Sequence, residues 1–169
     1  MPEADLTYKA MACAWCTANP TAYPASSEYG PGATSPEGVR YCFQHTPIGA
    51  LFAAANAIVQ GSDPAVSKEW LEHTLADGPY RDQIVGDGEA SGSSETRMNI
   101  VGFRMLAYDG ATARVDVAVR VTSGNSTVFT SGVYEWVWAE GDWKLRADIA
   151  EPLSVVRIPD LSGYVPWGA

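Results

Sequence analysis

The segment YCFQHTPIGALFAAANAIVQ, residues 41–60, combines a helix start with a long apolar stripe. Thr46 can accept hydrogen bonds from the first free backbone N–H groups, and Pro47 then takes the first helical position, where its missing N–H costs nothing. Apolar side chains follow at the spacing of one helix face: Ile48, Leu51, Phe52, Ala55, Ile58 and Val59. Alanines occupy much of the remaining surface. We therefore expect a helix that packs closely against a sheet.

Composition limits the classes of protein to which the chain can belong. With 169 residues, 46% of them hydrophobic, it has the length of a single domain with a sizeable core. Twenty acidic residues against eleven basic ones give a formal charge of −9, which would repel a phosphate backbone or an anionic membrane. We expect no nucleic-acid binding, and a charge of this kind most often serves solubility.

The sequence contains no apolar run close to the ~20 residues that span a bilayer. Its first residues, MPEADL, lack the basic and then apolar order of a secretory signal. We expect a soluble protein without direct membrane insertion.

The first half of the chain divides into three parts. Residues 1–45 are expected to be extended, with a short strand over residues 6–15, because the prolines and glycines of residues 19–38 exclude regular ladders and long helices. Residues 46–85 should form helices: Gly61 ends the first, Asp63 caps a second that starts at Pro64, and a short piece follows over residues 79–85. Residues 86–98 are rich in Gly and Ser and predict a mobile loop.

From residue 99 the hydrophobic period changes from 3.6 to 2. Four apolar runs over residues 99–149 are separated by the short turns Asp109-Gly110, Ser123-Gly124-Asn125 and Glu140-Gly141-Asp142, which predicts an antiparallel four-stranded meander. Residues 150–169 hold three prolines among many apolar residues and should strap back onto the domain. The expected fold class is α+β, with N-terminal helices packed on a curved antiparallel sheet, in one domain over residues 1–169.

Three aromatic side chains of the third run share one face of its strand: Tyr134, Trp136 and Trp138. If the helices cover the opposite face, that of Val133 and Val137, these rings lie on the outside, and contiguous exposed aromatics mark interfaces. The alternative is that the apolar C-terminal strap covers them. The aromatic set is the candidate interface, for another protein or for a second copy of the chain.

The order of elements, helices before a bent meander, resembles the nuclear transport factor 2-like (cystatin-like) cone. A more specific resemblance depends on short motifs found along nearly the whole chain: Tyr29-Gly-Pro31, Phe43-Gln-His-Thr-Pro-Ile-Gly-Ala50, Ala53-Ala-Ala-Asn56 and Leu161-Ser-Gly-Tyr-Val-Pro-Trp-Gly168. They resemble an uncharacterised family from actinobacteria and their phages, associated with conjugation. That resemblance implies a scaffold role in an assembly, typically outside a membrane anchor. The sequence itself departs from the family in lacking such an anchor. The resemblance then implies a virion-associated or cytoplasmic location for the chain as it stands, and an extracytoplasmic one for a piece of a longer, anchored protein.

The three cysteines allow three interpretations. Cys13-x2-Cys16 and Cys42-x2-His45 have the paired spacing of a tetrahedral zinc site with three thiolates and one imidazole. Against it, His45 directly precedes a helix cap and matches the family motif, which contains no cysteines. A disulfide between Cys42 and one of the others, or buried unreactive thiols, are the alternatives.

An isomerase or dehydratase of the same fold would place an acid or base inside the cone. The available groups are Asn56, His73, Tyr108, Asp116 and Tyr134. Asp116 shares a strand face with two arginines, which favours a solvated or ion-paired carboxylate over a base. No motif for a cofactor is present, since Gly86-x-Gly88 lacks the strand and the basic residue of a phosphate loop.

Taken together, the sequence predicts a non-catalytic protein-interaction domain, an accessory or structural subunit of a conjugation-related or phage assembly, with a small-molecule enzyme of the same fold as the alternative. The two differ in whether a cavity of several hundred Å³ with convergent polar groups lies between helix and sheet.

Overall fold

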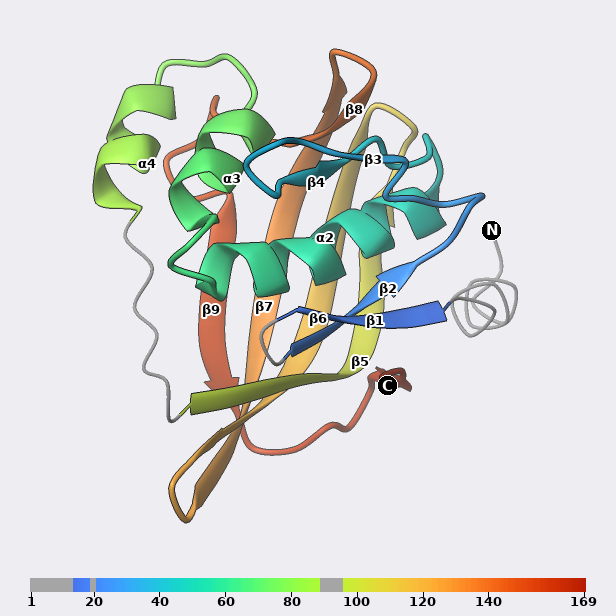
Figure 1. Ribbon diagram of the computed structural model, residues 1–169, viewed down its shortest axis with the longest axis vertical. Helices are drawn as coiled ribbons and strands as arrows, with labels where there is room; N and C mark the ends of the chain where they lie inside the picture. Colours follow the sequence, from blue (N-terminus) through green and yellow to red (C-terminus); the bar gives the residue numbers. More distant parts are fainter. Residues whose placement is uncertain (1–13, 19–20, 89–95) are drawn as a thin grey trace.

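The computed structural model describes residues 14–18, 21–88 and 96–169, and there the chain is a mixed α+β domain around one mostly antiparallel sheet (Figure 1). The expected meander is present. Its strands are β5 (Thr96–Tyr108), β6 (Thr112–Ser123), β7 (Ser126–Ala139) and β8 (Asp142–Leu145), each antiparallel to the next. The expected class, α+β, is confirmed.

Helix α2 (Pro47–Ser62) is the expected packing helix and crosses one face of the sheet (Figure 1). Thr46 is its N-cap, the Thr46 hydroxyl accepting from Gly49 N at 3.1 Å, and Pro47 follows at the first helical position. The predicted stop at Gly61 is early, because the helix continues to Ser62, whose hydroxyl donates to the Ile58 carbonyl at 2.6 Å.

The second helix starts later than expected. The Asp63 carboxylate accepts from Ala65 N at 2.9 Å and stabilises a turn there, so that α3 begins only at Ser67 and spans Ser67–Thr74. The short third helix, α4, is Arg81–Asp87, which includes the start of the expected loop. Residues 96–98, predicted as the end of that loop, belong to β5, and residues 89–95 lie outside the described part.

The C-terminal strap returns to the sheet, as expected, and contributes two strands that were not predicted. Strand β9 (Leu153–Ile158) pairs with the first half of β7, and β8 pairs with the second half on the same side. Strand β10 (Val165–Pro166) pairs with β5 at the opposite edge of the sheet. The segment between them therefore crosses from one edge of the sheet to the other (Figure 1).

The N-terminal segment contains more regular structure than its prolines suggested. Strands β1 (Ala14–Ala18) and β2 (Thr21–Ala25) form a hairpin, and β3 (Ala33–Thr34) pairs with β4 (Arg40–Tyr41). Pro24 is tolerated because β2 belongs to a two-stranded sheet, where one side of a strand needs no ladder partner. The predicted strand over residues 6–15 lies mostly outside the described residues.

The hairpin and the following segment cover the side of α2 that the sheet leaves free. Asn56 Nδ2 donates to the Pro24 carbonyl at 3.1 Å, and Gln60 Oε1 accepts from Arg40 N at 2.7 Å. Residues 48–60 of α2 are consequently all buried. The alanines on the remaining surface of α2 are therefore in contact with a second layer.

Replacing the N-cap residue tests how much α2 depends on its start signal. We expect Thr46→Ala to lower the free energy of unfolding by about 1 kcal/mol, because the Gly49 N–H loses its acceptor. Urea denaturation followed by circular dichroism measures this change. Thr127→Ala, at an exposed position in β7, is the control and should change stability by less than about 0.5 kcal/mol. Equal effects of the two substitutions would contradict the capping role.

Candidate functional site

A cleft of about 600 Å³ opens between the C-terminal half of α2, helices α3 and α4, and strands β7 and β9. The side chains around it are predominantly apolar. They include Ala57, Ile58, Trp70, Leu71, Ile84, Met98, Val119, Tyr134, Leu145, Pro152, Leu153 and Val155. We call this space the β9 cleft.

Two glycines shape its walls. A Cβ at Gly61 would lie 3.0 Å from Trp70 Cζ3, so the bare backbone of α2 lets the indole of α3 pack against it. On the floor, a Cβ at Gly132 would lie 3.4 Å from Tyr134 Cε2. A glycine in the middle of a strand often marks such a close approach, and Gly132 is a signal that the sequence offered.

Tyr134 is the main titratable group of the floor. It is 3% exposed, and burial raises the pKa of its hydroxyl. Its ring stacks on Trp136, with centroids 5.6 Å apart and planes 8° from parallel. A tyrosine hydroxyl is protonated at neutral pH, and the raised pKa makes its deprotonation harder still. The Tyr134 hydroxyl can therefore donate a hydrogen bond to a bound group but is unsuited to act as a base.

Among the described residues, the charged groups that line the cleft are acidic only. Its described lining contains no histidine, lysine or arginine, and its two carboxylates are Asp87 of α4 and Glu151 before β9. The Ser62 hydroxyl is already used within α2. The volume that an enzyme of this fold would need is present, whereas the paired acid and base are not found there.

The cleft opens beside a free sheet edge. β9 has β7 as its partner in the described part of the chain, and no backbone hydrogen bond from those residues reaches its other side. By contrast, the outer edge at β8 is covered, since Ala76 N donates to the Leu145 carbonyl and Tyr80 N to the Ala147 carbonyl, both at 2.9 Å. Natural proteins usually cover or charge such edges.

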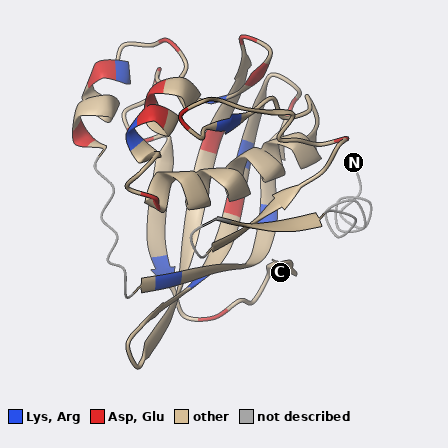
Figure 2. Ribbon diagram, viewed as in Figure 1, with Lys and Arg blue, Asp and Glu red and all other residues tan. Residues whose placement is uncertain are grey.

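Exposed apolar side chains lie on this free edge. Val155 is 62% exposed and Val156 is 53% exposed, on opposite faces of β9. Leu153 and Val155 point to the β9 cleft. Figure 2 shows both acidic and basic residues on α3 and α4, and a basic residue at the C-terminal end of β9, Arg157. An extended chain added to β9 would therefore place alternate side chains in the cleft.

The expected aromatic interface assumed that the helices cover the face of Val133 and Val137, and this assumption is wrong. Tyr134 and Trp136 are 3% and 1% exposed because α2 and α3 cover their face of β7, and Trp138 is half-buried. The alternation along the strand was predicted correctly, but the face was not. The opposite face carries Glu135, which pairs with Arg114 at 2.8 Å. The strap does not form the cover either, because it joins the sheet at its edges.

The zinc candidates that the structure describes do not form a site. Cys13 lies outside the described residues, Cys16 is half-buried in β1, and Cys42 is exposed after β4; neither described cysteine is in a disulfide. The His45 ring instead stacks on Trp138, 4.0 Å between centroids. Across residues 14–18, 21–88 and 96–169, no three His, Cys, Asp or Glu residues are grouped as a metal site.

Cys42 is not the buried thiol that the third interpretation expected. Its backbone takes a positive φ of 65°, and its N–H donates to the Asp142 carboxylate at 2.8 Å. Partial burial, and then the charge of Asp142, raise the pKa of the Cys42 thiol. The thiol is therefore less reactive than its exposure suggests.

The catalytic candidates are scattered. Asn56 is fully buried and makes structural hydrogen bonds, among them one accepted from Arg40 Nε at 2.8 Å. The His73 ring packs on Tyr41, and burial followed by the charge of Lys144 lowers its pKa. Tyr108 packs edge-on against Trp143, and burial raises its pKa. None of these three lines the β9 cleft.

Asp116 is ion-paired, as one of the two expectations had it, but it is buried rather than solvated. Asp116 is fully buried. Val115 pairs with Tyr134 and shares its sheet face, so Asp116, the next residue, lies on the opposite face. Its Oδ2 accepts from Arg104 Nη2 at 2.6 Å and from the Tyr164 hydroxyl at 2.8 Å, and its Oδ1 from the Ser131 hydroxyl at 2.5 Å. All four groups belong to one closed cluster, which ties the C-terminal tail to the sheet.

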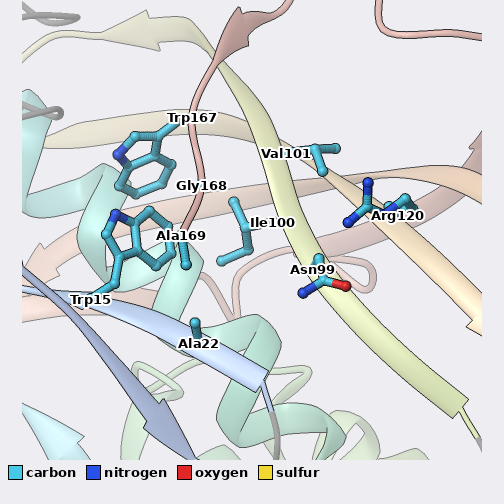
Figure 3. Close-up of a pocket in the computed structure, with 9 residues that line it drawn as sticks. All are labelled: Trp15, Ala22, Asn99, Ile100, Val101, Arg120, Trp167, Gly168 and Ala169. Carbon is cyan, nitrogen blue, oxygen red and sulfur yellow. The ribbon is translucent and has the colours of Figure 1, made fainter.

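Two other cavities are poorer candidates. One of about 280 Å³ lies at the C-terminus, where Arg120 and Val101 lie across β5 from Trp15 and Trp167, so its side chains do not converge (Figure 3). The other, of about 10 Å³ near Trp136 and His73, has room for one water molecule. The β9 cleft is the candidate functional site.

The helices that the structure describes include none that is both long and apolar enough to cross a membrane.

Comparison with known proteins gives one result. A family model described as a domain of unknown function (DUF8175) matches residues 2–166, from the N-terminal segment to β10. No curated protein and no solved structure matches the chain. Because that description carries no activity, organism or fold, the expected likeness to conjugation-associated proteins stays a prediction.

Proposed function

The chain belongs to the DUF8175 family, and we propose that it acts as a non-catalytic protein-interaction domain. The observation that carries this proposal is the free edge of β9 beside an apolar cleft, with Val155 62% exposed between them. An extended segment of a partner would pair with the open backbone of β9. Its alternate side chains would enter the cleft.

The chemistry of the cleft supports binding more than turnover. Apolar walls provide affinity for apolar side chains, while the Tyr134 hydroxyl and the carboxylates of Asp87 and Glu151 give a few polar contacts. Neither a nucleophile next to a base nor an acid and base pair lies in the described lining. We propose a scaffold or accessory role in an assembly, as the sequence resemblance implies, in conjugation or in a phage.

The arrangement of elements supports a further part of the proposal, that the domain is a nuclear transport factor 2-like cone. In this view α2 plugs the concave side of the sheet, and the β9 cleft is what remains open of the cone interior. A cone with its interior mostly filled by Phe52, Ile48 and Leu51, all fully buried, is suited to docking at its rim.

The alternative is a small-molecule enzyme of the same fold, favoured by the volume of the cleft and by the buried Tyr134 hydroxyl. A ligand of mainly apolar character would fit. Tyr134→Phe separates the two functions. Protein binding depends mainly on the β9 backbone and the apolar walls, so loss of one polar contact should weaken it only slightly, whereas loss of a turnover with the fold preserved would favour the enzyme.

The proposal predicts that one surface substitution removes partner binding. We expect Val155→Asp to abolish retention of the partner in affinity purification from the native source, because a carboxylate would have to be buried in an apolar interface. The fold should persist, since the side chain is exposed.

Leu106→Asp is the matched control, because Leu106 is also an exposed apolar residue, 40% exposed, but on β5 away from β9. It should leave partner binding unchanged. A partner that is retained equally by both variants, or lost equally with both, contradicts docking at β9.

A further inference from the structure

The free edge of β9 carries a sequence that complements itself when a second strand runs antiparallel to it. The segment is Glu151-Pro-Leu-Ser-Val-Val-Arg157. An acidic residue stands at one end, a basic residue at the other, and Leu153 and Val155 lie between them. This symmetry under reversal is the requirement for an interface around a twofold axis.

The backbone geometry selects the residues that can pair across the edge. Glu135 N donates to the Pro152 carbonyl at 2.8 Å, so in the alternation of an antiparallel ladder Ser154 and Val156 also direct their backbone groups to β7. The groups of Leu153, Val155 and Arg157 point outward. Pro159, without an N–H, ends this open row shortly after Arg157.

The two charged residues of the segment lack partners in the described part of the molecule. Glu151 and Arg157 are both exposed, and neither is in an ion pair among those residues. Within one chain they lie roughly 20 Å apart along the strand, too far to meet. Nothing among the described residues neutralises these two charges, which leaves both for a contact with another molecule.

We propose that the molecule at this edge is a second copy of the chain, paired antiparallel through β9 about a twofold axis at Ser154. This inference rests on the proposed function, because it names the partner of the same edge. Directly opposite pairs are then Glu151 with Arg157 of the second copy and Leu153 with Val155 of the second copy, each occurring twice. On the other face Val156 lies opposite Pro152 of the second copy.

Registers shifted by two residues pair these side chains less favourably. Shifted by two residues in one direction, Arg157 lies opposite Leu153 of the second copy; shifted in the other direction, Glu151 lies opposite Val155 of the second copy. Each shift leaves two charges facing apolar side chains, whereas the register centred on Ser154 pairs every charge with its opposite and every apolar residue with an apolar one. The pairing would join the two sheets and bring the two β9 clefts side by side.

A charge-reversal cycle on the full chain tests the proposal, with the dimer dissociation constant measured by sedimentation over micromolar to near-millimolar concentrations. Glu151→Arg and Arg157→Glu should each raise this constant about tenfold or more, because each places two like-charge pairs in the dimer. The double variant restores opposite charges and should return to within about threefold of the wild type. Glu28→Arg, exposed in the turn after β2, makes the same change in net charge as Glu151→Arg and should have no comparable effect.

The outcomes separate this inference from the proposed function. A wild-type chain that stays monomeric over the whole series overturns the second copy as partner, and so does a dimer that the reversals leave unchanged or that the double variant fails to restore. If the monomer still binds another protein and Val155→Asp removes that binding, the proposed function stands without the dimer. If neither association depends on Val155, both fail.

Discussion

Gly49→Ala is expected to destabilise the domain by about 3 kcal/mol or more, the largest effect we predict for adding a single methyl group. A Cβ at Gly49 would lie 1.8 Å from the Gln44 carbonyl oxygen, which is backbone and cannot rotate away. Moving Gln44 is costly because its carbonyl also accepts from Thr46 N at 2.8 Å and from Trp143 Nε1 at 2.9 Å. The start of α2 and its contact with β8 would be lost together.

Gly86→Ala is the matched control. Gly86 also lies within a helix, α4, but an added Cβ meets no atom within 4 Å. Since alanine favours helix by about 1 kcal/mol over glycine, Gly86→Ala should leave the domain as stable or slightly more stable. Thermal and urea denaturation of the two variants measure the difference. If Gly49→Ala unfolded at the same denaturant concentration as Gly86→Ala, the close approach of α2 to Gln44 would not exist.

Local signals in the sequence predicted the elements well. Thr46 and Pro47 mark the start of α2 by a hydrogen bond and a fixed φ that involve neighbouring residues only. The meander was also predictable from neighbouring residues, because apolar runs of period 2 alternate with short turns. Errors of a few residues arose where a side chain favours a turn over a helix, as Asp63 does by accepting from Ala65 N.

Which face of β7 is buried depends on long-range contacts, which the local sequence pattern does not reveal. The period of β7 separates Tyr134 from Glu135 but does not say which of the two faces α2 will cover. The aromatic face is the one with the larger apolar area, and burying it against α2 gains more free energy. Weighing side-chain area, rather than assuming that the valine face is inside, would have placed Tyr134 and Trp136 in the core.

The candidate site was missed for a related reason. A cleft depends on how α3, α4 and β9 are arranged around α2, which no local pattern encodes. The free edge did have a signal: Leu153–Ile158 is rich in β-branched residues and is bounded by Pro152 and Pro159, as expected of an edge strand. The same prolines argue against a strand through the whole tail, but they leave room for a short strand between them.

Asp116→Ala is expected to lower the free energy of unfolding by about 3 kcal/mol and to loosen the C-terminal tail. The substitution removes the acceptor for the Ser131 and Tyr164 hydroxyls and for the Arg104 guanidinium at once. The loss of this hydrogen-bond acceptor costs least at Arg104, because its side chain is 41% exposed and water can replace the carboxylate. Burial, and then the contact with Asp116, raise the pKa of Tyr164, so its hydroxyl remains a donor that needs this partner.

The tail should respond more than the rest of the sheet. Tyr164 immediately precedes β10, and a Cβ at Gly102 of β5 would lie 3.1 Å from Tyr164 Cβ, so the tail is held closely against β5. We expect amide exchange at β10 and the adjoining residues of β5 to accelerate in Asp116→Ala. Asp116→Asn keeps an acceptor oxygen and the shape of the side chain, and should lose about half as much stability.

Asp148→Asn provides the control for an ion pair without burial. Asp148 pairs with Arg146 at 2.8 Å, but its side chain is 60% exposed, so the loss should be below about 1 kcal/mol. Urea denaturation ranks the three variants, and hydrogen exchange locates the change. The Asp116 cluster lies on the sheet face away from the β9 cleft, and Asp148 is not among the residues that line this cleft. All three variants should therefore still bind the partner when folded. An Asp116→Asn variant that kept its stability and tail protection but lost an activity would instead make Asp116 a functional carboxylate.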